Sequence, residues 1–237
     1  MAVPLPLLVR RVHKWLALAV GLQALIWTIS GMYMVAVHID YIHGDHLVRT
    51  PQEQPIDLSR LVAPSTVSSQ LTNVQAVRLS QLPDRPTYIV KTSKGSHLFD
   101  AITGAKLPMV DQATIRTLAE QRMAEDRQIT KISLLDRSPL EVKAHPAPLW
   151  RVDFEGWDKP AFYFSPVTGE LLSRRHEAWR VFDFMWMLHI MDYDDRENMN
   201  NWLLRPMTWG AVAMALSGAW LLWWSFPRKK RKKKVAA

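Results

Sequence analysis

The sequence predicts an α+β domain of two tandem helix-plus-hairpin units, placed between two transmembrane α-helices. Residues 15–37 form an uncharged run of 23 positions. As a helix this run spans roughly 34 Å, more than a hydrocarbon core of about 30 Å. Residues 207–226 form a second uncharged run, and the chain between the two runs is polar with alternating, strand-like stretches.

These patterns divide the chain into eight segments. The first apolar run is longer than the core of a typical cleaved signal peptide, which favours an uncleaved anchor. The segments are a cytoplasmic N-terminus (1–14), transmembrane helix 1 (15–37), a juxtamembrane linker (38–55), two repeated units (56–110 and 111–175), an amphipathic outer-face segment (176–202), transmembrane helix 2 (203–226) and a basic cytoplasmic tail (227–237).

Charge predicts the orientation. Arg10, Arg11 and Lys14 precede the first apolar run, and the sequence RKKRKKK (228–234) follows the second. Positive flanks stay cytoplasmic, so both termini are expected inside and residues of about 38–202 across the membrane. The tail supplies seven positive charges of a net +8 and is explained as a membrane anchor, so we expect lipid and no nucleic acid as a partner. The chain has no cysteine, hence no disulfide.

The polar middle contains a repeat. Residues 87–107 and 150–172 each read as a strand, a glycine-containing turn, a second strand and a Thr-Gly turn. The glycines of the two Thr-Gly turns, Gly104 and Gly169, are 65 positions apart. A stretch with helical periodicity precedes each hairpin, at 57–70, where Pro64 breaks it, and, with Asp111 as N-cap, at 111–124. This order predicts the α+β class.

The residues carry a resemblance to the PepSY domain and to the PepSY-associated transmembrane family, and it covers nearly the whole chain. The matching motifs are D-x-x-T-G (100–104), S-P-V-T-G (165–169), R-x-x-H-K-W (10–15), W-T-I-S-G-M-Y (27–33), W-M-L-H (186–189), N-W-L-L-R (201–205) and S-G-A-W-L-L-W (217–223). The resemblance implies a bacterial inner-membrane protein with a periplasmic domain, linked to iron acquisition. Some members resemble siderophore reductases that carry b-type haem.

The chain departs from the larger members of that family in two ways. It has two predicted spans where they usually have four, so a four-helix haem bundle needs a homodimer or a partner membrane subunit. It also lacks a flavin or nicotinamide domain, and no G-x-G-x-x-G or P-loop pattern is present. Electrons would therefore have to come from a quinol or another redox donor.

Three histidines are candidates for holding haem b. Two axial imidazoles must lie at one membrane depth, and His13 and His38 are 25 residues apart, or roughly 37 Å along a helix. We therefore expect one haem on His38 and His189 at the outer face, and a second that uses His13 across a dimer. The alternatives are an interfacial cation for His13, a helix cap for His38 and a carboxylate partner for His189.

A metal site is a further candidate in HIDYIHGDH (38–46). His43 and His46 are three positions apart and Asp45 adds an oxygen ligand, a set that suits zinc, copper or iron. Gly44 interrupts the helix that would align them, and no cysteine assists. The alternative is a polar exit from the membrane.

The function predicted from these observations is electron transfer across the membrane through haem b to a ferric chelate or another periplasmic acceptor, with the chain as an oxidoreductase component. One alternative is a tethered PepSY binding or regulatory module, acting as a peptidase inhibitor or chaperone. Another is an accessory subunit of a larger membrane complex.

Overall fold

The computed structural model describes residues 4–50 and 55–225, and the chain divides into two compact units. We call residues 1–36 with 182–237 the helical unit and residues 37–181 the sheet unit. The predicted basic tail at 227–237 and residues 51–54 of the predicted linker lie outside the described residues.

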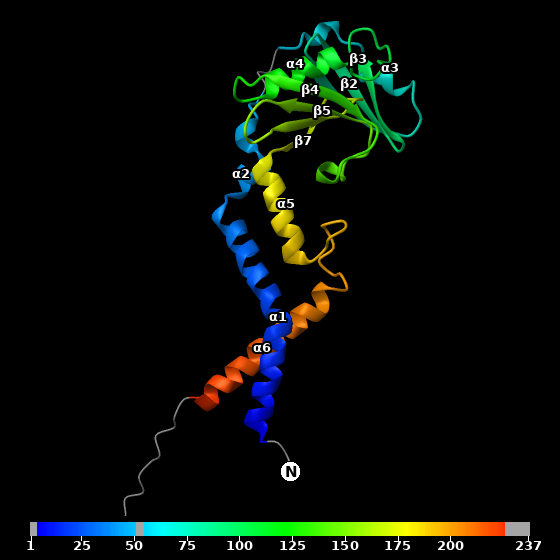
Figure 1. Ribbon diagram of the computed structural model, residues 1–237. Helices are drawn as coiled ribbons and strands as arrows, with labels where there is room; N and C mark the ends of the chain where they lie inside the picture. Colours follow the sequence, from blue (N-terminus) through cyan, green and yellow to red (C-terminus); the bar gives the residue numbers. More distant parts are fainter. Residues whose placement is uncertain (1–3, 51–54, 226–237) are drawn as a thin grey trace, which may run out of the picture. The chain divides into compact units, whose positions relative to one another are not determined.

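The sheet unit has the predicted α+β composition and contains two small antiparallel sheets (Figure 1). The first sheet has the order β1-β2-β3 and the second β4-β5-β6-β7. The strands are β1 (Val74–Leu82), β2 (Arg85–Thr92), β3 (Gly95–Asp100), β4 (Ile129–Leu135), β5 (Leu149–Phe154), β6 (Ala161–Phe164) and β7 (Leu171–Arg175).

One hydrophobic core joins the two sheets. Ile89 and Leu98 from the first sheet are buried in the same cluster as Val152 and Phe162 from the second. Helix α4 (Gln112–Arg122) contributes its buried face to this cluster. Because both sheets bury side chains in one core, the two halves of the sheet unit are not independent domains.

The two Thr-Gly turns are built alike. Asp100 and Ser165 each accept hydrogen bonds through the side-chain oxygen from the backbone N–H groups two and three residues later, at 2.8 and 2.9 Å and at 3.3 and 3.1 Å. Gly104 and Gly169 have φ of +73° and +71°, and each N–H donates to the carbonyl that opens its turn, at 2.9 Å. Glycine suits this left-handed conformation because it has no Cβ.

The helices of the sheet unit differ in part from the prediction. Asp111 caps α4 as expected, accepting a 2.8 Å hydrogen bond from the N–H of Thr114. The predicted helix at 57–70 is reduced to α3 (Pro64–Ser68), because Pro64 starts a helix but cannot continue one. The remaining short helices are α2 (Ile39–His43) and the 3₁₀ turns η1 (Asp45–Leu47), η2 (Leu58–Arg60) and η3 (Leu140–Val142).

The helical unit contains α1 (Leu5–Ala36), the end of α5 (Glu177–Ile190) and α6 (Leu204–Ser225). Helix α1 begins ten residues before the predicted span. Within the described part of the chain it is the one helix long and apolar enough to cross a membrane. Helices α1 and α6 approach closely at Gly210, where a Cβ atom would lie 2.9 Å from the Val20 side chain. Glycine therefore permits this packing.

Candidate functional site

His189, near the end of α5, contacts α1 at Ser30. The His189 Nδ1 and the Ser30 Oγ are 2.9 Å apart, and Ser30 is fully buried. The Ser30 hydroxyl donates its single proton to the Ile26 carbonyl at 2.7 Å. When the hydroxyl donates there, its oxygen accepts from the imidazole, which is the tautomer with the His189 proton on Nδ1 and the lone pair on Nε2.

Polar side chains of α1 hold the end of α5. The Trp27 indole N–H donates to the His189 carbonyl at 2.7 Å, and the Gln23 amide donates to the Leu188 carbonyl at 3.2 Å. The last carbonyls of a helix lack partners within the helix, so these bonds satisfy groups that would otherwise stay unpaired. The backbone that carries His189 is thus fixed to α1.

Among the described residues the partner of the His189 ring is Ser30, and no carboxylate takes the place that the sequence left open for one. The nearby Asp192 carboxylate accepts hydrogen bonds from the N–H groups of Glu197 and Asn198, at 2.9 and 2.8 Å. These bonds lower the pKa of Asp192 against a smaller effect of burial. The carboxylate organises its own loop, and the partner that the structure shows for the His189 ring is a serine.

His13, near the N-terminus of α1, is also paired with a serine. Its Nδ1 lies 2.9 Å from the Ser217 Oγ of α6. The Ser217 hydroxyl donates to the Met214 carbonyl at 2.9 Å, so its oxygen also accepts from the ring. In that arrangement the His13 proton is on Nδ1 and Nε2 carries the lone pair. Ser217 is a hydrogen-bond partner and not a second haem ligand, so the expectation that a His13 haem needs a second chain stays a prediction.

A glycine follows the serine in both cases. A Cβ at Gly218 would lie 3.2 Å from the His13 Cε1, and one at Gly31 would lie 3.7 Å from the His189 Cε1. Ser-Gly occurs at 30–31 and 217–218 of the sequence, which is the signal by which these sites can be found. The motifs W-T-I-S-G-M-Y and S-G-A-W-L-L-W contain both pairs; the contact of each serine with a histidine ring, and the room that each glycine leaves beside it, come from the structure.

His38 has a local role. It belongs to the sheet unit, where it caps α2 and its Nδ1 accepts a 3.3 Å hydrogen bond from the N–H of Asp40. Its side chain is 76% exposed. This is the helix-cap role named as the alternative to haem binding, and a haem shared by His38 and His189 stays a prediction.

The structure does not bring the three predicted metal ligands together. Asp45 forms an ion pair with Arg174, and the His46 ring stacks on Tyr41 at 4.5 Å between centroids. Gly44, with φ of +73°, ends α2 after His43. Among the residues that the structure describes, no group of three His, Cys, Asp or Glu side chains is placed to hold a metal ion.

The sequence matches one protein-family model over most of its length. The model of the PepSY-associated TM region matches residues 10–237. The chain belongs to this family. The match includes α1, the sheet unit, α5 and α6, and so covers His13, His189 and both Ser-Gly pairs. No curated protein and no solved structure matches the chain.

Proposed function

We propose that this PepSY-family protein is a membrane electron carrier in which His13 and His189 are axial ligands of haem b. The observation that carries the proposal is the shared geometry of the two histidines: each Nδ1 lies 2.9 Å from a serine oxygen that can accept its proton, which leaves Nε2 for a ligand, and a glycine lies beside the ring. Histidines that ligate a metal usually donate their other N–H to a fixed acceptor, which holds the tautomer and the ring orientation. The residues present therefore fit the group.

The rings of His13 and His189 lie at two different heights along the axis of α1. His13 and Ser30, the contact of His189, are 17 residues apart, which is about 25 Å along a helix. Each level offers one imidazole from one chain. A second copy of the chain, or a partner membrane subunit, supplies the second ligand at each level.

Haem, when bound, supplies one-electron transfer. The protein supplies the serines that accept each Nδ1 proton and the helix α1, which spans the membrane. Helix α6 is the second span and brings the C-terminus back to the side of the N-terminus. The exposed side chains of α6 include Trp209, Leu216 and Leu222, which suits contact with lipid. We further propose a bacterial inner-membrane location with the sheet unit in the periplasm, a quinol or other redox partner as donor, and a ferric chelate as the acceptor.

The test is a dithionite-reduced minus oxidised spectrum of the detergent-purified protein, with haem quantified as its pyridine complex. We expect a b-type spectrum, and we expect His13→Ala and His189→Ala each to lose about half of the haem, because each removes one of two levels. His43→Ala is the matched control and should keep all of it, and His38→Ala tests the remaining candidate. A colourless protein from haem-supplied cells would contradict the proposal and favour a tethered binding module.

A further inference from the structure

A cleft of about 490 Å³ lies beside β5 in the sheet unit. Its volume is within the range of small-molecule sites in proteins. Four of its lining residues are cationic, Lys131, Arg151, Lys159 and Arg180, and two are acidic, Asp153 and Glu177. The lining therefore carries an excess of positive charge, and nothing in the proposed electron transfer uses it.

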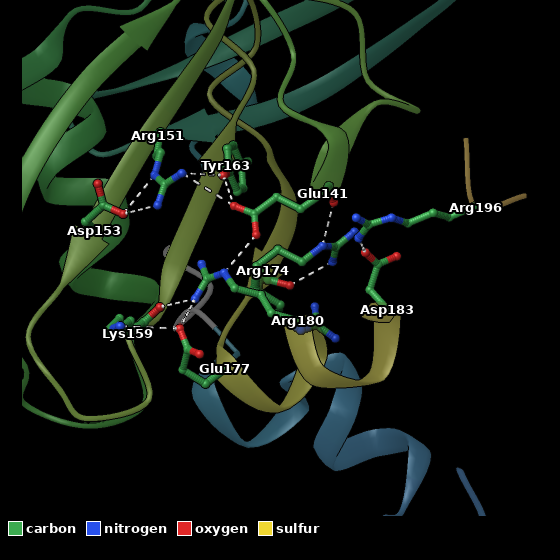
Figure 2. A network of polar contacts seen from close by, with 11 residues as sticks. Glu141, Arg151, Asp153, Lys159, Tyr163, Arg174, Glu177, Arg180, Asp183 and Arg196 are labelled. Carbon is green, nitrogen blue, oxygen red and sulfur yellow. Dashed lines mark hydrogen bonds and ion pairs between the residues drawn. The ribbon is translucent and has the colours of Figure 1, made fainter. Parts of the chain in front are cut away.

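The Glu141 carboxylate orients two of the cations, Arg151 and Arg180 (Figure 2). Arg151 and Arg180 donate to the Glu141 carboxylate at 3.4 and 3.0 Å, and its side chain is 14% exposed. The Tyr163 hydroxyl donates to the same carboxylate. Burial, and then this bond, raise the pKa of Tyr163, so the phenol keeps its proton and stays a donor. The guanidinium groups are thus oriented before any ligand arrives.

The other two cations form an open rim. The Lys159 side chain is 75% exposed and lies 3.9 Å from Glu177, and Lys131 is exposed with no ion pair among the described residues. Lys159 has φ of +44°, a left-handed conformation that is uncommon for a residue with a Cβ. Its carbonyl accepts a 3.1 Å hydrogen bond from Arg180, which helps to hold the loop in this conformation.

The two carboxylates define the ligand further. Asp153 pairs with Arg151 at 2.7 Å, and Glu177 with Arg180 at 3.1 Å, but both retain free acceptor capacity. They would repel a bare anion and accept a hydrogen bond from a hydroxyl group. We propose that the cleft binds a small hydroxylated anion, either a hydroxycarboxylate or a phosphate ester. The proposal does not depend on haem binding.

The experiment is isothermal titration calorimetry of the full-length protein in detergent with three probes. Citrate presents carboxylates and a hydroxyl, tricarballylate is the same triacid without the hydroxyl, and glycerol 3-phosphate presents a phosphate ester. Binding of citrate but not of glycerol phosphate identifies the hydroxycarboxylate class, and the reverse identifies the phosphate class. Tricarballylate that binds as tightly as citrate would overturn the role of the hydroxyl, and absence of binding by all three up to about 1 mM would overturn the site.

Variants separate the cleft from general charge effects. Lys131→Glu with Lys159→Glu should weaken binding of the probe at least about tenfold, because both reversals place negative charge at the rim. These side chains are exposed, and circular dichroism checks that the double variant folds. Lys94→Glu, on the β2–β3 turn, makes the same kind of charge change and should bind as the wild type does. Equal affinity in the double variant, or equal loss in Lys94→Glu, would overturn the proposal.

Discussion

Three histidines of this protein differ in the groups that face their rings. The Nδ1 atoms of His13 and His189 face serine oxygens, which accept from the ring when the serine protons go to backbone carbonyls. His176 faces the carbonyls of Tyr41 and Ile42 through Nε2, at 2.9 and 3.1 Å, so its proton lies on Nε2. A carbonyl only accepts, which leaves no other assignment.

His176 differs also in burial. It is fully buried, and among the described residues its Nδ1 has no hydrogen-bond partner. Its ring meets His46 and Tyr41 edge-on, at 5.3 and 5.4 Å between centroids. Burial lowers the pKa of His176, outweighing its two backbone hydrogen bonds, and the effect of Asp158, which raises that pKa, is smaller still. The folded chain therefore favours the neutral ring.

This pKa predicts a loss of stability in mild acid. Above the ordinary histidine pKa of about 6.5 the ring is neutral in both states, and below it the unfolded chain binds a proton that the folded chain resists. The wild type should therefore lose thermal stability between about pH 7.5 and about pH 5.5. His176→Gln should be less stable at the higher pH but lose less on acidification. His43→Gln, an exposed control in the same segment, should follow the wild type; equal pH slopes for wild type and His176→Gln would refute the assignment.

At the scale of elements, the hairpins and α4 were predictable, and the strands β1, β4 and β7 were not. Alternation and Thr-Gly turns indicated β2 with β3 and β5 with β6, and Asp111 indicated the start of α4. Strands β1 and β4 each begin with an irregularity, between Val74 and Ala76 and between Ile129 and Lys131. A bulge shifts the side-chain alternation by one residue, so the two-residue period that reveals a strand is broken where it starts.

The Thr-Gly turns predict unequal effects of the same substitution. Alanine in the left-handed conformation costs roughly 1–2 kcal/mol, so both Gly104→Ala and Gly169→Ala should lower the free energy of unfolding. A Cβ at position 169 would lie 3.0 Å from the Leu82 and Leu118 side chains, whereas one at 104 has ordinary contacts of 3.5 Å or more. Gly169→Ala should therefore be the more destabilising, as measured by urea unfolding of the two variants side by side. Equal losses of unfolding free energy would show that the Leu82 and Leu118 side chains move away from the new methyl group at no measurable cost.

At the scale of the whole molecule, the sequence could place histidines along a helix but could not say what they contact. The separation of His13 from His38 was argued from helical rise, which needs no tertiary information, and it stays a prediction because α1 ends at Ala36 and His38 belongs to the sheet unit. The pairing of His13 with Ser217 joins residues 204 positions apart, and that of His189 with Ser30 joins residues 159 apart. Such contacts depend on how three helices pack, which no local pattern encodes.

Among the described residues, α1 is the one helix that is long and apolar enough to cross a membrane. The proposed two-span topology therefore depends on whether α6 crosses it as well. Tryptophans at 209, 220, 223 and 224 lower the mean hydropathy of α6 without adding charge, and tryptophan favours the membrane interface. The positive residues Arg10, Arg11 and Lys14 in the first turns of α1 and the basic tail after α6 predict that both ends of the chain are cytoplasmic. A span by α6 is needed for that arrangement.

Cysteine labelling decides between one span and two, and the absence of native cysteine makes each label specific. Lys94→Cys lies on the exposed β2–β3 turn of the sheet unit, and Ala236→Cys lies in the basic tail. A membrane-impermeant maleimide added to intact spheroplasts should modify Lys94→Cys alone, and after lysis it should modify both. Modification of both before lysis would mean that α6 lies on the same side as the sheet unit. In that case Ser217 could not reach His13 within the membrane, and the inner haem level would be lost with the second span.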